Sequence, residues 1–380
     1  MKNQVAIKLE YPGKKDIQTI LTMAEAATLV HQMGDGGDWL IEGENLAVMQ
    51  ALFQYGWKAK IDLVYIDPPF ATNSIFRRGK ERTSTISSRS GDEVAYTDQL
   101  TGSSFLEFMR ERLVFLRELM SEEASLYMHI DTKIGHYLKV ILDEIFGFEN
   151  FRGDITRIKC NPKNFKRRAY GNIKDMLLFY TKSNRYTWNE PKVEKQPEVN
   201  RRLFPKIDAH GNRYTTNPLH APGETQNGVT GQAWRGIQPP PGRHWRYEPA
   251  VLDELDRQGL IEWSANGVPR KIIYASDHAA ARRQDIWEFK DPQNPVYPTE
   301  KNLDLLKAII CASSNPGDRV LDCFCGSGVT LAAAALQGRH WIGIDRSPIA
   351  IQVARQRLEG YEIPYQFFTA PDQLAKFPNQ

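Results

Sequence analysis

Residues 61–70, Ile-Asp-Leu-Val-Tyr-Ile-Asp-Pro-Pro-Phe, join a short apolar run to a carboxylate, two prolines and an aromatic ring. The run from Leu63 to Ile66 is apolar and partly β-branched, which is typical of a buried strand in a parallel sheet. Parallel sheets hold ligands at the carboxyl ends of their strands. We therefore expect Asp67 to point into a crevice.

The residues that follow this strand fit a planar amine. Pro69 favours an extended Pro68, and neither proline has an N–H, so the backbone presents carbonyl acceptors in fixed directions. A carboxylate beside such a carbonyl can accept both hydrogens of one exocyclic NH2 group, while Phe70 stacks on the ring that carries it. The alternative is a structural Pro-Pro turn with an incidental Asp67.

A second pattern lies near the other end of the chain, at residues 319–345. A strand through Asp322 leads to the glycine turn Gly326-Ser327-Gly328, an Ala-rich helix over 331–336 and a second strand ending at Asp345. Asp345 follows Gly328 by about 17 residues, close to the spacing of an acid that binds ribose hydroxyls. A structural strand–helix–strand unit without a ligand is the alternative.

The glycine turn lacks the third glycine and the lysine of a phosphate-binding loop. It therefore favours a nucleoside ligand without phosphates, with Asp345 on the ribose, Asp322 facing the amino end, and Gly326 and Gly328 allowing close backbone approach. S-adenosylmethionine is such a ligand, and an amine held by Asp67 could receive its methyl group.

Over most of its length the chain resembles the beta-class amino-methylating DNA methyltransferases, which include the modification subunits of type III restriction systems. The resemblance rests on residues 40–46, 67–70, 127–131, 142–147 and 297–347. It implies an α/β fold: a circularly permuted Rossmann-like methyltransferase sheet with the catalytic motif before the cofactor motif and an inserted target-recognition region. The two strands that carry the motifs are then expected to be neighbours.

The resemblance also implies roles for particular residues. The catalytic group would be Asp67, Pro68, Pro69 and Phe70, with Asp67 and Pro68 binding the amine and Phe70 stacking on the base. The S-adenosylmethionine site would comprise Glu44, Asn45, Thr299, Lys301, Asp322, Phe324, Gly326, Ser327, Gly328, Thr330 and Asp345. Asn302 stands where the family commonly has proline, so the turn at Lys301 is expected to differ.

Positive charge is concentrated in one stretch of the chain. Residues 151–250 hold 19 Lys and Arg against 8 Asp and Glu, a net charge of +11 in a chain whose total is +3. Basic residues interleaved with aromatic ones suit phosphates and exposed bases, although a solvated surface is the alternative. The predicted DNA contacts are Arg77, Arg78, Lys163, Lys166, Arg167, Arg168, Arg235, Arg243, Arg246 and Arg270.

We expect three parts of the chain. Residues 1–182 would form the catalytic half, with an N-terminal helix over 17–32 and a mobile loop over 71–104. Residues 183–284 would form the target-recognition insert, and 285–380 the cofactor-binding half. Further expected elements are helices over 105–120 and 137–146, a strand over 125–130, and a hairpin of 155–158 with 176–180. His129 and Asp131 could lie near the pocket, with core packing as the alternative for His129.

Composition bounds the remaining possibilities. With 380 residues, 41% of them hydrophobic, the chain can bury a full α/β core and one smaller module. No apolar run approaches the roughly 18 residues of a membrane span, and no signal peptide is evident, so we expect a cytoplasmic protein. The four cysteines, Cys160, Cys311, Cys323 and Cys325, suit neither a disulfide framework nor a zinc site, and no metal is expected.

The predicted activity is methyl transfer from S-adenosylmethionine to the N6 amine of a flipped adenine in double-stranded DNA. An N4-cytosine enzyme on the same scaffold is the nearest alternative; among the resembling enzymes, Asp at position 67 favours adenine. A catalytically silent DNA-binding subunit is a more distant alternative, and methylation of RNA or protein is disfavoured by the basic insert. A restriction subunit and a second copy of the chain stay open as protein partners.

Overall fold

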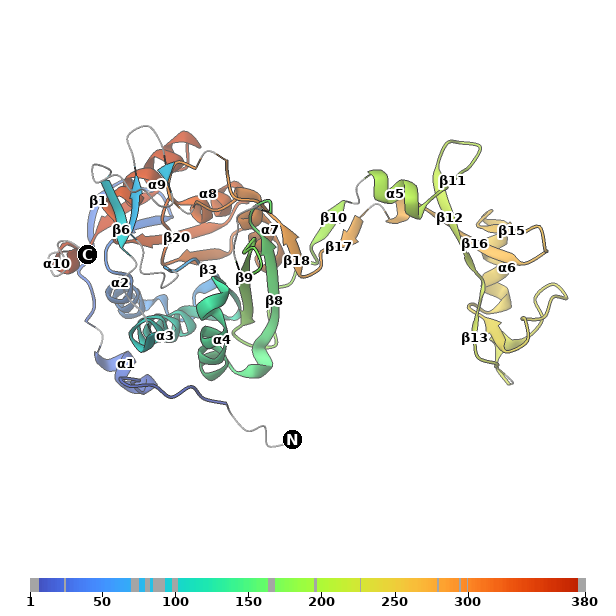
Figure 1. Cartoon of the computed structure of the whole chain (residues 1–380), viewed down its shortest axis with the longest axis horizontal. Coiled ribbons are helices and arrows are strands. Elements are labelled where there is room, and N and C mark those ends of the chain that lie inside the picture. The colour runs from blue at the N-terminus through green and yellow to red at the C-terminus, as the bar shows by residue number, and fades with distance from the viewer. Residues whose placement is uncertain are drawn as a thin grey trace. The chain divides into compact units, whose positions relative to one another are not determined.

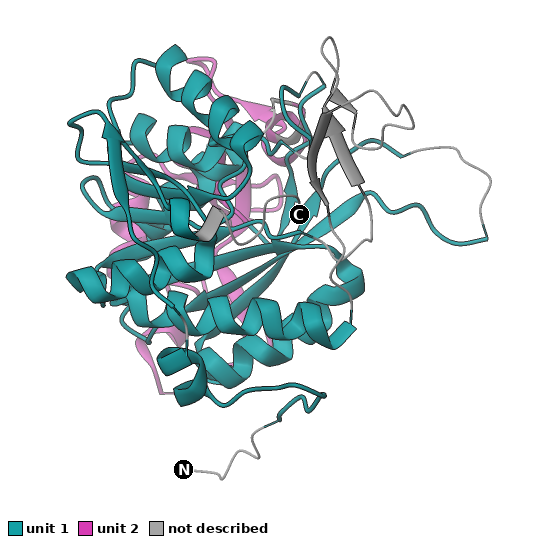
Figure 2. Cartoon of the chain, turned by 90° about the vertical axis from the view of Figure 1, so that its left-hand side faces the viewer, with its two compact units in different colours: residues 1–191, 284–380 teal, residues 192–283 magenta. Residues whose placement is uncertain are grey.

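The computed structural model describes residues 7–23, 25–69, 75–78, 83–84, 93–97, 102–162, 168–194, 197–225, 227–278, 280–293, 295–298 and 300–374. Two compact units can be distinguished, residues 1–191 with 284–380, and residues 192–283 (Figure 2). The first unit is built from both ends of the chain, and the second is inserted between them.

The described residues of the first unit form a ten-stranded sheet. Six neighbouring strands are parallel, from β21 to β7, and β9 then runs antiparallel to β7 and β8. In spatial order the strands are β1 (Val30–Met33), β21 (Gln366–Thr369), β2 (Trp39–Glu42), β20 (His340–Asp345), β19 (Arg319–Asp322), β3 (Ile61–Ile66), β7 (Met120–Ile130), β9 (Lys174–Thr181), β8 (Phe151–Ile158) and β18 (Ile286–Glu288).

Helices cover both faces of this sheet, as Figure 1 shows. On one face lie α2 (Asn45–Leu52), α3 (Gly102–Leu119) and α4 (Thr132–Phe146), and on the other α7 (Leu303–Ser313), α8 (Val329–Leu336) and α9 (Pro348–Gly360). Each set of helices buries its apolar side chains against the sheet in a separate core. This double cover explains why β3 is apolar on both faces: Leu63 and Val64 are both fully buried.

The two motif strands are neighbours, as expected. Val320 of β19 pairs in parallel with Leu63 of β3, although the two residues come from opposite ends of the chain. The chain leaves β19 toward β20 on one side and leaves β3 toward β7 on the other. Loops that diverge in this way open a crevice at the carboxyl ends of the two strands, and Asp67 and Asp322 both lie there.

The second unit is a small β-rich module with its own core. Its core includes Trp234, Trp245 and Leu252. Its elements are α5 (Pro197–Leu203), α6 (Pro249–Arg257), the sheet β11 (Lys206–Ile207), β12 (Arg213–Pro218), β16 (Pro269–Tyr274) and β15 (Ile261–Trp263), the pair β13 (His220–Pro222) and β14 (Arg243–Trp245), and the pair β10 (Lys192–Glu194) and β17 (Ala280–Arg282).

The expected insert began at residue 183, whereas the compact unit begins at Lys192. Residues 183–191 belong to the first unit, where the Asn189 side-chain amide donates to the carbonyls of Cys311 and Ser314. These two hydrogen bonds to the end of α7 hold residues 183–191 against the first unit, whereas their composition had suggested that they belong to the insert.

Two expectations for the N-terminal third are wrong. The helix predicted over 17–32 ends early: α1 spans Ile17–Met23, and Val30–Met33 form β1, which pairs with β21 from the far end of the chain. The segment 71–104, expected as a loop, contains the three-stranded sheet β4 (Ile75–Arg78), β5 (Thr83–Ser84) and β6 (Glu93–Thr97), and α3 already begins at Gly102. In both places strand pairing outweighs local composition.

The other expected elements are confirmed with shifted ends. The predicted helices correspond to α3 and α4, the strand to β7, and the hairpin to β8 and β9, which pair antiparallel. In the part of the chain that the structure describes, no helix has the length and apolarity needed to cross a membrane.

Candidate active site

Asp67 follows the last residue of β3 and is held through one carboxylate oxygen. Its Oδ2 lies 2.6 Å from the Nζ of Lys301, which precedes α7. Its other oxygen, Oδ1, is buried and has no hydrogen-bond partner among the described residues. Pro68 is buried beside it, and Phe70 lies outside the described residues. A fixed carboxylate thus retains one buried acceptor, which is the arrangement needed to receive an N–H.

Asp322 ends the neighbouring strand β19 and is almost completely buried, with 2% of its surface exposed. Its Oδ1 accepts a hydrogen bond from the Phe324 backbone N–H at 3.0 Å. Burial raises the pKa of Asp322 to about 7; hydrogen bonds from Thr330 and Phe324 oppose the rise, and the nearby charges of Asp67 and Asp345 add to it. The carboxyl group is therefore close to half-ionised at neutral pH.

Asp345 ends β20 and organises the glycine turn. Its Oδ2 accepts from the Gly326 N–H at 2.8 Å and its Oδ1 from the Ser347 N–H at 2.9 Å. Burial raises the pKa of Asp345, and these two backbone donors oppose the rise. Each carboxylate oxygen still has a lone pair for a further donor such as a hydroxyl.

The glycines of this turn meet two different needs. Gly326 and Gly328 have φ angles of 49° and 72°, a region that residues with a side chain avoid. A Cβ on Gly328 would lie 2.9 Å from the Cβ and 3.1 Å from the Cα of Ala354 on α9. Gly328 is therefore required for the packing of α8 on α9, in addition to its left-handed conformation.

Two predicted cofactor contacts, Glu44 and Asn45, are engaged with the protein itself. Glu44 caps α2 by accepting from the Ala47 N–H at 3.1 Å, and its other oxygen pairs with Arg112 of α3. The Asn45 amide donates to the Cys323 carbonyl at 2.8 Å and accepts from Arg112 at 2.6 Å. Arg112 was not singled out from the sequence, since a charged residue in a charged helix is expected on the surface.

The remaining predicted cofactor residues surround the same turn. Thr330 hydrogen-bonds the Asp322 side chain, Ser327 is buried, and Phe324 packs against the ring of Phe108 with centroids 6.2 Å apart. Lys301, predicted as a cofactor contact, makes its ion pair with Asp67. Thr299 lies outside the described residues.

Asn302, which replaces the family's proline, begins α7 by capping it. Its side-chain oxygen accepts from the backbone N–H groups of Asp304 and Leu305. Asparagine is among the best N-cap residues, so the helix start next to Lys301 is well defined without proline.

His129 belongs to a buried polar chain across the sheet. Its Nδ1 lies 2.9 Å from the Tyr65 hydroxyl and its Nε2 lies 3.2 Å from Oδ2 of Asp175. Burial and the charge of Lys301 lower the pKa of His129, which keeps the ring neutral near pH 7. Asp131 caps α4 through the Lys133 N–H at 2.7 Å. Both residues have structural partners, and the alternative of core packing holds for His129.

The predicted DNA contacts separate into distinct groups. Lys163, Lys166 and Arg167 lie outside the described residues, as do the side chains of Arg77 and Arg78 on β4; Arg168 is exposed. Arg235 is held by ion pairs with Asp253 at 3.1 Å and Asp256 at 2.5 Å.

By contrast, Arg243, Arg246 and Arg270 gather around His220 in the second unit. Arg243 lies 3.2 Å from His220 Nδ1, and burial followed by the charges of the three guanidinium groups lowers the pKa of His220. Arg270 donates to Thr216, and Arg246 to the Pro218 carbonyl. The structure thus gives one cluster of three guanidinium groups on β14, β16 and the turn after β14.

Comparison with known proteins identifies the family of this chain. The family model N6_N4_Mtase, described as DNA methylase, matches residues 61–356. The chain is 41% identical over 368 residues to the type II methyltransferase M.EcaI of Enterobacter cloacae, covering 92% of this chain and 77% of that protein. It is 25% identical over 354 residues to the Mod subunit of the type III restriction-modification enzyme StyLTI of Salmonella typhimurium, covering 84% of this chain and 53% of that protein.

A crystal structure of the M1.HpyAVI–SAM complex aligns with 84% of this chain and 98% of that one, with a TM-score of 0.46 and 17% identity. The matched region of the family model runs from the first residue of β3 into α9 and contains Asp67, Asp322 and Asp345. The chain belongs to the N6_N4_Mtase family of DNA methylases.

Proposed function

We propose that this chain methylates the N6 amine of adenine in double-stranded DNA at the Asp67 site. The observation that carries the proposal is the buried Oδ1 of Asp67, an acceptor without a described partner at the carboxyl end of the central strand. The Lys301 ammonium occupies the other oxygen and so fixes the rotation of the carboxylate. A target amine can therefore donate to Oδ1 without displacing Lys301.

The proposed mechanism is orientation of a weak nucleophile. The lone pair of an exocyclic amine is delocalised into its ring, and two acceptors on its hydrogens, Asp67 Oδ1 and the Pro68 carbonyl, would favour a more tetrahedral nitrogen. That lone pair could then attack the methyl group in line, so that the nitrogen–carbon bond would form as the carbon–sulfur bond breaks and a neutral thioether leaves, and the nitrogen would then release one proton. Positioning and electrostatics would be the main contributions. The base must first leave the helix, at a cost of a few kcal/mol. Stacking on Phe70 stays a prediction.

The residues around the glycine turn fit the methyl donor. S-adenosylmethionine supplies an activated methyl group on a positively charged sulfonium and also carries an ammonium group. Asp322 is buried and Asp345 is partly buried, and the charges of Asp67 and Asp345 both act on Asp322, so a cationic ligand would relieve this repulsion. We assign Asp322 to the ammonium and the free lone pairs of Asp345 to ribose hydroxyls.

We propose the cluster of Arg243, Arg246 and Arg270 as the principal DNA contact of residues 192–283. Guanidinium groups bind phosphate and guanine edges in a bidentate manner. Arg235 is a weaker candidate, because Asp253 and Asp256 already hold its guanidinium. We also propose that the reaction takes place in the cytoplasm, because the similar methyltransferases come from bacteria, whose DNA lies there. A restriction subunit and a second copy of the chain are the protein partners that this function suggests.

Nucleoside mass spectrometry on unmethylated DNA, incubated with the protein and S-adenosylmethionine, tests the proposal. N6-methyladenine is the expected product, and it should be absent with Asp67→Ala but present with Asp304→Ala, which removes an exposed carboxylate on α7. If N4-methylcytosine is formed instead, the protein is an N4-cytosine methyltransferase, which is the alternative activity. No product from any DNA would favour a silent DNA-binding subunit.

A further inference from the structure

Arg112 is a buried arginine whose guanidinium connects α3 to the cofactor side of the sheet. Its Nε donates to Asn45 Oδ1 at 2.6 Å, one terminal nitrogen donates to the Phe108 carbonyl at 2.8 Å, and the other pairs with Glu44. The guanidinium also lies 3.4 Å from the centre of the Phe108 ring. A buried charge is tolerated only when its donors are satisfied, and here all three nitrogens have partners.

A line of hydrogen bonds continues from Arg112 to Asp322. The Asn45 amide, oriented by Arg112, donates to the Cys323 carbonyl at 2.8 Å. That carbonyl and the Phe324 N–H belong to one planar peptide group, so fixing the first fixes the direction of the second. The Phe324 N–H donates to Asp322 Oδ1 at 3.0 Å.

We propose that Arg112 is a positioning residue for cofactor binding, which sets the Asp322 carboxylate through Asn45 and the Cys323–Phe324 peptide. The inference rests on the proposed role of Asp322. It also changes the role of Asn45: both ends of its amide are used by the protein, so Asn45 acts as a bridge in this line. Loss of Arg112 should leave Asp322 in place but allow its carboxylate several orientations.

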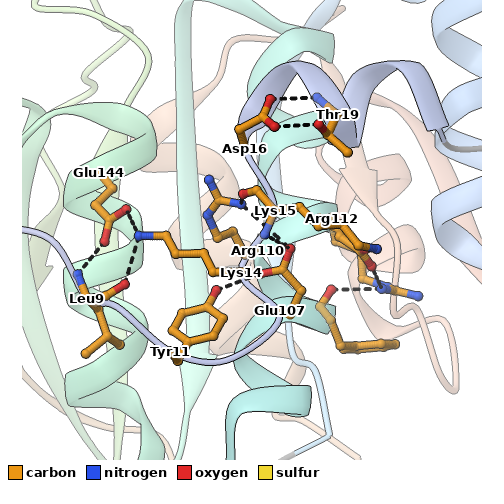
Figure 3. Close-up of polar contacts among 12 residues, drawn as sticks. Leu9, Tyr11, Lys14, Lys15, Asp16, Thr19, Glu107, Arg110, Arg112 and Glu144 are labelled. Atoms are coloured by element: carbon orange, nitrogen blue, oxygen red, sulfur yellow. Dashed lines mark hydrogen bonds and ion pairs between the residues drawn. The ribbon is translucent and has the colours of Figure 1, made fainter.

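Arg110 provides a matched control on the same helix. Arg110 and Arg112 are both 4% exposed. Arg110 pairs with Glu107 on α3 itself at 3.7 Å and donates to the Lys15 carbonyl of the N-terminal segment (Figure 3). That segment is held further by the Tyr11 hydroxyl, which donates to Glu107 at 2.8 Å. Arg110 thus contributes to packing without contact to Glu44 or Asn45.

The first test compares S-adenosylmethionine affinity and thermal stability in Arg112→Met and Arg110→Met by isothermal titration calorimetry and thermal melting. Both variants should lose stability. Only Arg112→Met should bind more weakly, by about 10- to 100-fold, by analogy with the effect of removing residues that orient the ligands of a metal ion. Equal affinities in the two variants would overturn the inference. If Arg112→Met does not fold, Asn45→Ala interrupts the same line without changing α3 and should show the same loss.

A double-mutant cycle with Asp322→Asn separates this inference from the proposed function. An Asp322→Asn variant with wild-type affinity would refute the cofactor role of Asp322 itself. If Asp322→Asn weakens binding, Arg112→Met should weaken it little further in the double variant, because both act on one carboxylate. Losses that multiply would show that Arg112 acts by another route and would overturn the inference.

Discussion

Asp322→Asn should make the cofactor-free protein more stable at pH 8 while weakening its hold on S-adenosylmethionine. The carboxyl group ionises with a pKa of about 7 in the fold, against 3.8 as its ordinary value. It therefore binds its proton more tightly when folded, and the stability that this proton contributes is lost as the pH rises from about 4 through 7. At 1.36 kcal/mol for each pKa unit, the ionised group costs the fold about 4 kcal/mol at pH 8.

Asparagine removes that cost and retains the acceptor for the Phe324 N–H. We expect the variant to resist denaturant better than the wild type at pH 8 and to match it near pH 4. Cofactor binding should change in the opposite direction: losing a charged hydrogen bond, typically about 1.5–3 kcal/mol, weakens binding about 10- to 100-fold. In the wild type, affinity should fall as the pH drops below 7 and Asp322 becomes protonated, and the fall should level off at a similar loss of about 10- to 100-fold.

The change in stability can be measured by denaturant titration of the wild type and the variant from pH 4 to 8. The change in affinity can be measured by calorimetric titration with S-adenosylmethionine over the same pH range. Asp318→Asn is a suitable control, because burial also raises the pKa of Asp318, which lies at the other end of β19. The stability prediction is wrong if the variant is less stable than the wild type at pH 8. The assigned role of Asp322 is wrong if the variant binds the cofactor with unchanged affinity.

Three further changes have defined outcomes. Gly328→Ala should lower the melting temperature and cost more than about 1 kcal/mol, because it combines a left-handed backbone with a clash against α9; an unchanged melting temperature would contradict this. Arg243→Ala should weaken DNA binding and reduce the slope of log affinity against log salt concentration by about 0.9, whereas Arg235→Ala should change neither the affinity nor the slope. If the two variants have the same slope, the guanidinium cluster does not contact DNA. Lys301→Met should slow methyl transfer in single-turnover experiments while leaving cofactor affinity near that of the wild type, because it releases the Asp67 carboxylate; weakened cofactor binding at a normal rate would place Lys301 at the cofactor.

The parts of the site that the sequence predicts are those whose chemistry is local. Asp67 directly follows its strand, and Asp345 follows the glycine turn by about 17 residues, so each of the two patterns lies within a short stretch of sequence and can be recognised there. That Asp67 and Asp322 lie close together could be predicted only from the family resemblance, because no local feature of the sequence indicates that β3 pairs with β19.

The parts that could not be predicted depend on contacts between distant segments. Lys301 and Asp67 form their ion pair across most of the chain, and β1 becomes a strand only because β21 offers it an edge. Arg112 and Asp175 have the sequence context of surface charges, yet both are buried in the fold. The sequence shows that a side chain is charged, but it does not show whether the folded protein provides a buried partner for that charge.

In the proposed mechanism Asp67 acts on the target amine and not on the cofactor. Single-turnover methyl transfer by Asp67→Ala, measured beside its affinity for S-adenosylmethionine, tests this most directly. We expect a loss of transfer of at least about 100-fold, the typical effect of removing one group that acts in the transition state, with cofactor affinity within a few-fold of the wild type. Transfer at the wild-type rate, or a loss explained wholly by weaker cofactor binding, would contradict it.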